Sequence, residues 1–234
     1  MCIRDRKKSI LINFFSILKS IECLLNLVKD SFLGIPFYRF YYPGDVEKVA
    51  YELEKQQWRR NDFNWIWAGI NERGTGRNIH EEPVFADLFA WINECLEEVR
   101  KDLAPHATAL KLCSSWANKN DPGDHFFDHT HPNCFLSSNY YASGHNKDKT
   151  VWLLPNPWYS NSNISPFGDY TDTKYHIMHE EETEPGKYIC FPPHIRHYAQ
   201  PNTTNKPRMT IAANAFPSGL IESGGVSRLR VEVS

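Results

Sequence analysis

The sequence has little net charge, no closely spaced cysteine pair and no long uninterrupted apolar run. Its formal net charge is -2 and its pI is near 6.5. Nothing in this balance draws the whole chain to nucleic acid or to an anionic membrane. The six cysteines are scattered and form no C-x-x-C pair, which favours free thiols in a reducing compartment over a disulfide framework. We therefore expect a cytoplasmic protein without a nucleic-acid partner.

Residues 1–33 stand apart from the remainder of the chain. An apolar run follows Lys7 and Lys8, but Lys19 and Glu22 interrupt it, so it falls short of the roughly 20 apolar residues of a membrane span. Its apolar residues recur at helical spacing: Leu11, Phe14, Phe15, Leu18, Ile21, Leu25 and Val28. We expect an amphipathic helix or a non-native extension, because the first six residues also resemble a translated sequencing adapter. A membrane anchor is the less favoured alternative.

Two helices are predicted before a strand-rich region. Residues 34–42 are rich in aromatic side chains and favour a strand, and Asp45 is placed to cap a helix over residues 46–59. A second helix is predicted over residues 82–103, because its apolar residues form one stripe between two prolines. The polar residues 69–78 are predicted to be a connection rather than a binding loop.

Short apolar or alternating runs fill the second half of the chain. The runs are residues 109–116, 135–142, 150–154, 188–191 and 209–216. Turn residues separate them and no helical pattern lies between them, which disfavours a parallel sheet and favours an antiparallel sandwich or barrel, a jelly roll included. With two helices ahead of the sheets and no internal repeat, we expect one compact α+β domain.

Histidines are concentrated in the strand-rich half, where eight of the ten lie between His125 and His197. Residues two apart on an extended strand point to one face, so His129 and His131 can both reach one metal ion. His197 is the candidate third ligand, because it follows a strand and the stiff turn Phe191-Pro192-Pro193. An H-x-H pair is weak evidence by itself, and two exposed strand histidines without a metal are the alternative.

Two other residues near this pair are weaker candidates for ligands. Asp128 precedes His129 and points to the opposite face of a regular strand, so only a bulge would bring its carboxylate to the metal. His194 lies three residues before His197, and the spacing to Arg208 favours His197.

Several further polar and aromatic residues are predicted to have structural roles. We expect His125 to pack beside its aromatic neighbours. Residues 176–182 contain two histidines and three glutamates, and we expect them to form a solvated polar segment, since acidic runs are usually exposed. Trp116, Tyr140 and Tyr141 are predicted to belong to the core rather than to a substrate platform.

Arg208 lies eleven residues after His197, at the start of a predicted strand. On that strand Arg208, Thr210 and Asn214 share one face and offer a guanidinium, a hydroxyl and an amide. The planar fork of an arginine binds a carboxylate through two hydrogen bonds, which suits the distal carboxylate of 2-oxoglutarate. A structural salt bridge is the alternative role for Arg208.

Five motifs together resemble a branch of the 2-oxoglutarate and Fe(II)-dependent oxygenases that carries H-x-H-P. They are Trp116-Ala117-Asn118, His129-Thr130-His131-Pro132-Asn133, Leu136-Ser137-Ser138-Asn139-Tyr140-Tyr141, residues 186–197, and Arg208-Met209-Thr210. The resemblance covers residues 116–216. It implies a double-stranded β-helix, or jelly roll, within residues 34–234, with the preceding helices packed on one face.

The resemblance also implies roles for individual residues. His129 is the first Fe(II) ligand, His197 is the distal one, and Arg208 clamps the far carboxylate of the cosubstrate 2-oxoglutarate. Further cosubstrate contacts fall on Thr210, Asn214 and Tyr141. His131 stands where most of the superfamily has an acid, so a three-histidine centre and a two-histidine centre with His131 nearby both stay open. Cys134 and Ser138 also depart from the branch.

The implied reaction is decarboxylation of 2-oxoglutarate to succinate, coupled to hydroxylation of a C–H bond. The substrate expected is a protein side chain, as in a peptide, or a small metabolite. One alternative is a cupin-like dioxygenase with three histidines that uses no 2-oxoglutarate, where Arg208 would bind a substrate carboxylate. Another is a jelly-roll binding module without turnover. The sequence leaves the oligomeric state open.

Overall fold

The computed structural model describes residues 27–32, 34–60, 66–69, 78–145, 147–155, 176–223 and 227–233. The helix predicted within residues 11–28 falls outside these residues except at its end, and nearly all of the connection predicted at residues 69–78 does so too. Val28 lies in strand β1 (Val28–Phe32), not in a helix. Strand β1 pairs antiparallel with β2 (Ile35–Tyr41) over its whole length.

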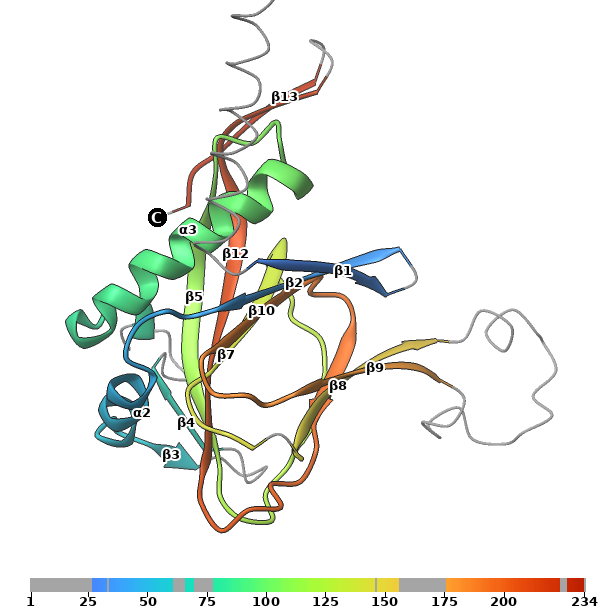
Figure 1. The fold of residues 1–234 in the computed structure, drawn as a ribbon. Coiled ribbons are helices and arrows are strands. Elements are labelled where there is room, and N and C mark those ends of the chain that lie inside the picture. Colours follow the sequence, from blue (N-terminus) through green and yellow to red (C-terminus); the bar gives the residue numbers. More distant parts are fainter. Residues whose placement is uncertain are drawn as a thin grey trace, which may run out of the picture.

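Two antiparallel sheets form the body of the protein (Figure 1). The large sheet has the order β1-β2-β10-β7-β12-β5-β4-β3, and β13 adds to β12; the small sheet has the order β6-β11-β8-β9. The remaining strands are β3 (Arg59–Arg60), β4 (Ile66–Gly69), β5 (Ala109–Asn120), β6 (Phe126–His129), β7 (Leu136–Tyr141), β8 (Lys149–Pro155), β9 (His176–Glu182), β10 (Lys187–Phe191), β11 (Arg196–Ala199), β12 (Arg208–Ser223) and β13 (Ser227–Val231). This order is that of a double-stranded β-helix in an α+β protein, which confirms the fold class.

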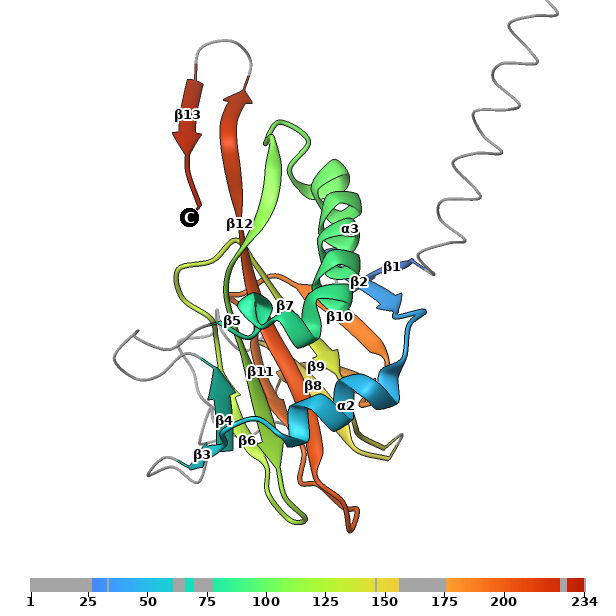
Figure 2. The same ribbon diagram turned by 90° about the vertical axis from the view of Figure 1, so that its left-hand side faces the viewer.

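The helices cover one face of the large sheet (Figure 2). They are α2 (Val46–Glu54), the 3-10 turns η1 (Ile79–Glu81) and η2 (Pro83–Phe85), and α3 (Ala86–Leu103). The predicted cap is present, since Asp45 accepts a hydrogen bond from Lys48 N at 2.9 Å. Helix α2 ends earlier than predicted because the Trp58 indole donates to Leu53 O, one of the carbonyls at the helix end.

Two separate hydrophobic clusters lie on the two faces of the large sheet. The outer cluster joins the apolar stripe of α3 to the sheet and includes Phe89, Ile92, Tyr140, Tyr188 and Ile211. The inner cluster fills part of the space between the sheets and contains Phe37, Tyr141, Trp152, Ile189, Phe191 and Ile195. Burial of these large side chains holds the helices and the two sheets together.

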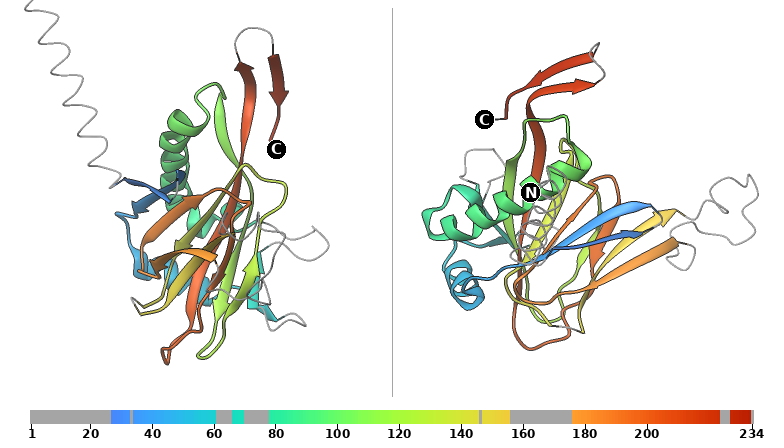
Figure 3. Two further views of the ribbon diagram at one scale, coloured as in Figure 1. Left: turned by 90° about the vertical axis from the view of Figure 1, so that its right-hand side faces the viewer. Right: turned by 45° about the horizontal axis from the view of Figure 1, so that its top comes forward.

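Strands β9 and β11 were not among the predicted strands, because their sequences HIMHEEE and RHYA are largely polar. Residues 176–182 form the edge strand β9, which pairs with β8. The expected solvation holds for Met178, Glu180 and Glu182, which are exposed, and fails for Glu181. Glu181 is 8% exposed, since it binds Arg39 and Lys187 of the large sheet. Strand β12 continues beyond its predicted end and forms with β13 a hairpin that projects from the body (Figure 3).

Candidate metal and cosubstrate site

Neighbouring strands of the small sheet bring two of the candidate ligands together. His129 ends β6 and is the register partner of His197 in β11, and their ring centroids are 4.4 Å apart. His131 lies beyond the strand, where its backbone N–H donates to Pro193 O at 3.0 Å. The chain then turns at Asn133, whose φ of 58° lies in the left-handed region that asparagine tolerates. The Pro-Pro turn therefore fixes His131 beside the strand pair.

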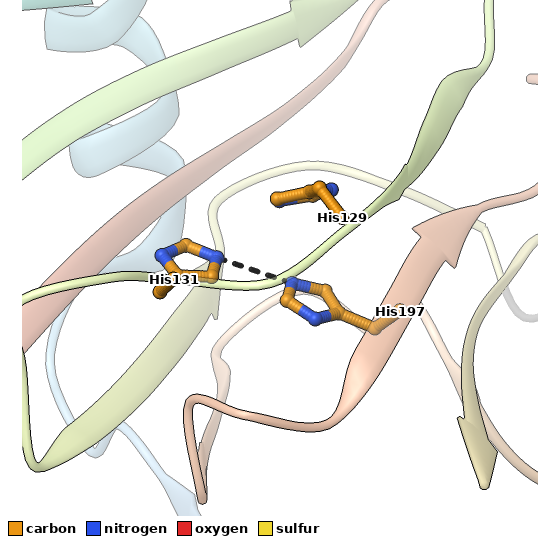
Figure 4. A group of neighbouring side chains, drawn as sticks. All are labelled: His129, His131 and His197. Carbon is orange, nitrogen blue, oxygen red and sulfur yellow. Dashed lines mark hydrogen bonds between the residues drawn. The ribbon is translucent and has the colours of Figure 1, made fainter. Parts of the chain in front are cut away.

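The three histidines converge on one point (Figure 4). Their candidate ligand atoms all lie within 4.8 Å of one another, and His131 Nε2 is 3.2 Å from His197 Nε2. The Nδ1 atoms of His129 and His197 lie 3.0 Å from Phe127 O and 3.1 Å from Ile195 O. Because a carbonyl accepts only from a protonated nitrogen, both rings carry hydrogen on Nδ1 and offer Nε2 as the ligand atom.

A polar network lies behind His131. Asn214 acts on His131 by raising its pKa, against the effect of burial. Ser137 Oγ donates to Asn214 Oδ1 at 2.9 Å, and Asn214 Nδ2 donates to Ser114 Oγ at 3.2 Å. These two serines fix the orientation of the Asn214 amide.

Burial keeps the three imidazoles neutral. It lowers the pKa of His129, and it lowers the pKa of His131 to about 4, with a further contribution from the charge of His129. The pKa of His197 falls well below its usual value through burial and then through the two other histidines. Three neutral rings with nitrogen lone pairs at one point are the form in which histidine binds a metal.

Arg208 is 2% exposed and keeps donors available. Its Nη2 donates to Asn120 Oδ1 at 3.2 Å and to Gln200 O at 2.7 Å. Its Nη1 has no acceptor among the described residues, and Asp148 Oδ2 lies 3.7 Å away. Burial lowers the pKa of Arg208, although Asp148 opposes this effect. The guanidinium is still charged at neutral pH.

One cavity joins the histidines to Arg208. It holds about 490 Å³ of space between atoms, part of it open to solvent. The residues that line it are Trp116, Asn118, Asn120, Phe126, His129, His131, Asn139, Tyr141, Thr150, His197, Tyr198, Ala199, Arg208, Thr210 and Ala212. All the predicted site residues except Asn214 therefore meet at this cavity, and Asn214 lies behind His131.

Some lining residues carried no signal in the sequence. Asn120 and Thr150 belong to no motif, yet Asn120 holds Arg208 and Thr150 Oγ1 accepts a hydrogen bond from Tyr141 OH at 2.9 Å. Trp116, which we expected in the core, lines the cavity and stacks on His131 with ring centroids 5.5 Å apart. Its expected place was wrong because its alternation along β5 points it to the inner face.

The weaker candidates lie elsewhere. Asp128 pairs with Arg196 and is not in the histidine cluster, which is the only group with metal-ligand spacing among the described residues. His194 and His125 are exposed, so the expected packing of His125 is not observed. His179 of β9 contacts Arg39 of β2 and Glu181 of β9.

A double-stranded β-helix with three histidines and an arginine at one cavity defines the class of non-haem iron oxygenases that use 2-oxoglutarate. Residues 114–214 match the model of the family described as "Putative 2OG-Fe(II) oxygenase". The match bears out the resemblance that the motifs predicted, and the family's description names Fe(II) and 2-oxoglutarate. Among curated proteins, none matches the sequence at a significant level.

Solved structures share the fold at low sequence identity. HygX from Streptomyces hygroscopicus, solved with nickel, 2-oxoglutarate and hygromycin B, is 13% identical over 80% of this chain and 84% of its own, with a TM-score of 0.55. The epimerase SnoN from nogalamycin biosynthesis is 12% identical over 82% of both chains, with a TM-score of 0.54. A Pseudomonas putida prolyl-4-hydroxylase is 11% identical over 77% of this chain and 92% of its own, with a TM-score of 0.50. These likenesses establish the fold.

No helix in the described part of the chain is long and apolar enough to cross a membrane. The four cysteines in the described part, Cys95, Cys113, Cys134 and Cys190, are all free.

Proposed function

We propose that His129, His131 and His197 bind Fe(II) as a three-histidine centre. The supporting observation is the 3.2 Å separation of His131 Nε2 and His197 Nε2. Nitrogens bound at about 2.1 Å and at right angles lie about 3.0 Å apart, so the two rings already have the spacing of adjacent ligands. Carbonyl oxygens hold the Nδ1 atoms of His129 and His197, so both rings present Nε2 to the metal.

Arg208 binds the distal carboxylate of 2-oxoglutarate in this proposal. The buried Nη1 lacks an acceptor, and a buried donor without a partner is destabilising unless a ligand supplies one. Thr210 and Tyr141 line the same cavity and offer hydroxyl groups. These residues fit a linear diacid that reaches from the arginine to the metal, whereas Asn214 serves the site through His131.

The proposed activity is hydroxylation of a C–H bond in a protein side chain or a small metabolite, within a catalytic domain of residues 34–234. Bound Fe(II) and 2-oxoglutarate supply the oxidising chemistry. The chain's own residues orient the cosubstrate through Arg208, hold the histidines in one tautomer, and exclude water with Trp116 and Phe126 at the cavity wall. Stacking of Trp116 on His131 restrains that ring during the reaction.

Release of succinate tests this proposal against both alternatives. Purified protein in air should convert 2-oxoglutarate to succinate only when Fe(II) is present, and slow turnover without a substrate is sufficient. A three-histidine dioxygenase independent of 2-oxoglutarate would bind iron and form no succinate. A binding module would take up no oxygen under any of these conditions.

A further inference from the structure

Asp148 is a buried carboxylate next to Arg208 that does not line the cavity. It is 1% exposed. Its Oδ1 accepts hydrogen bonds from Thr203 N at 3.2 Å and from Thr203 Oγ1 at 2.6 Å. Its Oδ2 has no hydrogen-bond partner among the described residues and lies 3.7 Å from Arg208 Nη1. The carboxylate and the guanidinium thus face each other without a hydrogen bond.

The two side chains hold their positions independently. Arg208 is fixed through Nη2 by Asn120 and Gln200, whereas Asp148 is fixed through Oδ1 by Thr203. Neither set of bonds involves the other residue. Asp148 therefore acts on Arg208 through its charge and not by setting its geometry.

That charge matters because both groups are removed from water. Opposite charges at 3.7 Å attract far more strongly in the interior than at the surface. Asp148 offsets much of the positive potential that Arg208 presents to the cavity. A carboxylate that approaches Nη1 gains less from the arginine and is also repelled by Asp148.

We propose that Asp148 limits the affinity of Arg208 for a carboxylate, so that 2-oxoglutarate binds firmly only when the metal holds its other end. This inference rests on the proposed cosubstrate site. Glutarate has both carboxylates of 2-oxoglutarate but lacks the keto oxygen needed for chelation, so the site binds it weakly. Succinate, the product, is likewise released easily.

Calorimetric titration under anaerobic conditions tests the inference. The variant Asp148→Asn preserves an acceptor for Thr203 and removes the charge. It should bind 2-oxoglutarate in the Fe(II) protein about ten-fold more tightly than the wild type, and it should bind glutarate measurably without metal. The control Glu180→Gln loses the same charge at a half-exposed pair with Lys149 and should bind both diacids as the wild type does.

Unchanged or weaker binding of 2-oxoglutarate by Asp148→Asn would overturn the inference. If that variant fails to fold, the wild type decides the question. The inference is also overturned if the metal-free wild type binds glutarate as tightly as the Fe(II) wild type binds 2-oxoglutarate. Equal binding of 2-oxoglutarate by wild type and Arg208→Ala is a different result. It would remove the proposed cosubstrate site itself and the inference with it.

Discussion

Two groups of polar side chains lie between the sheets, and they differ in whether their hydrogen-bonding atoms pair within the group. The first is the cavity site, made of His129, His131, His197 and Arg208. The second is the Arg39 cluster, made of Arg39, His179, Glu181 and Lys187. Both contain histidine and arginine, but only the Arg39 cluster contains a carboxylate.

The partners of each group distinguish the two. In the Arg39 cluster, Glu181 accepts hydrogen bonds from Arg39 Nε at 2.6 Å and from Lys187 Nζ at 3.4 Å, and it contacts His179 Nε2 at 2.8 Å. In the cavity site, Arg208 Nη1 has no acceptor and two imidazole nitrogens face each other at 3.2 Å. Side chains whose donors and acceptors pair with one another hold the sheets together. Side chains whose donors and acceptors stay unpaired around a cavity are typical of a ligand site.

Loss of a proposed ligand should have the largest effect. We expect His197→Ala to lower Fe(II) affinity by more than about 100-fold, beyond the loss typical of an outer partner of a ligand. Equilibrium dialysis with Fe(II) under anaerobic conditions measures this. The matched variant His179→Ala, in the Arg39 cluster, should bind Fe(II) normally. Equal losses in both variants would show that the two groups do not differ as described.

Loss of Glu181 should instead affect stability. We expect Glu181→Gln to lower the free energy of unfolding by about 3 kcal/mol, because it leaves Arg39 and Lys187 buried without their carboxylate. Urea unfolding at pH 7 measures the change. Iron affinity of the folded variant should match that of the wild type, and a selective loss of iron binding with normal stability would contradict this assignment.

The contribution of Glu181 should also depend on pH. Burial would raise the pKa of Glu181, but His179, Arg39 and Lys187 outweigh it and lower the pKa to about 2 from the ordinary 4.5. The carboxylate therefore stabilises the fold fully above pH 4.5, and this stability is lost as the pH falls toward 2. The difference in unfolding free energy between wild type and Glu181→Gln should shrink from pH 5 to pH 3. A difference that grows over that range would exclude the assigned role.

Loss of Arg208 should have a smaller and more selective effect. We expect Arg208→Ala to bind Fe(II) as the wild type does and to bind 2-oxoglutarate about 10 to 100-fold more weakly, the loss typical of hydrogen bonds to a charged group. Calorimetry on the anaerobic Fe(II) protein measures both affinities. Arg39→Ala is the control from the satisfied cluster, and its folded fraction should keep the wild-type affinity for 2-oxoglutarate.

The smallest change is expected for a substitution that preserves a ligand at residue 131. His131→Asp replaces an imidazole by the carboxylate that is commoner at this place and should keep iron affinity within about ten-fold of the wild type, whereas His131→Ala should lose more than that. If alanine and aspartate bind iron equally well, His131 lies near the metal without being its ligand.

The sequence was sufficient for the features that depend on periodicity and motif spacing. The apolar stripe of α3 and the strand β12 follow from residues that repeat at fixed intervals. The order of His129, His197 and Arg208 follows from the spacing of the motifs. The fold class and the family follow from the same motifs. In the structure these residues meet because strand pairing brings β6 and β11 side by side.

Contacts between distant segments could not be predicted from the sequence. Glu181 lies in an acidic run that is typical of a solvated surface, and only its pairing with Arg39, 142 residues away, explains its burial. Asp148 belongs to no motif, and its approach to Arg208 depends on two loops. The hydrogen bond from Ser137 to Asn214 likewise depends on the register between β12 and β7, which pairs these two residues.

Anaerobic addition of 2-oxoglutarate to the Fe(II) protein tests the central claim most directly. Chelation of iron by the cosubstrate should produce a weak metal-to-ligand charge-transfer absorption that saturates with 2-oxoglutarate and is absent in His197→Ala. Iron that binds to the wild type while its absorption stays unchanged on adding 2-oxoglutarate would contradict the account.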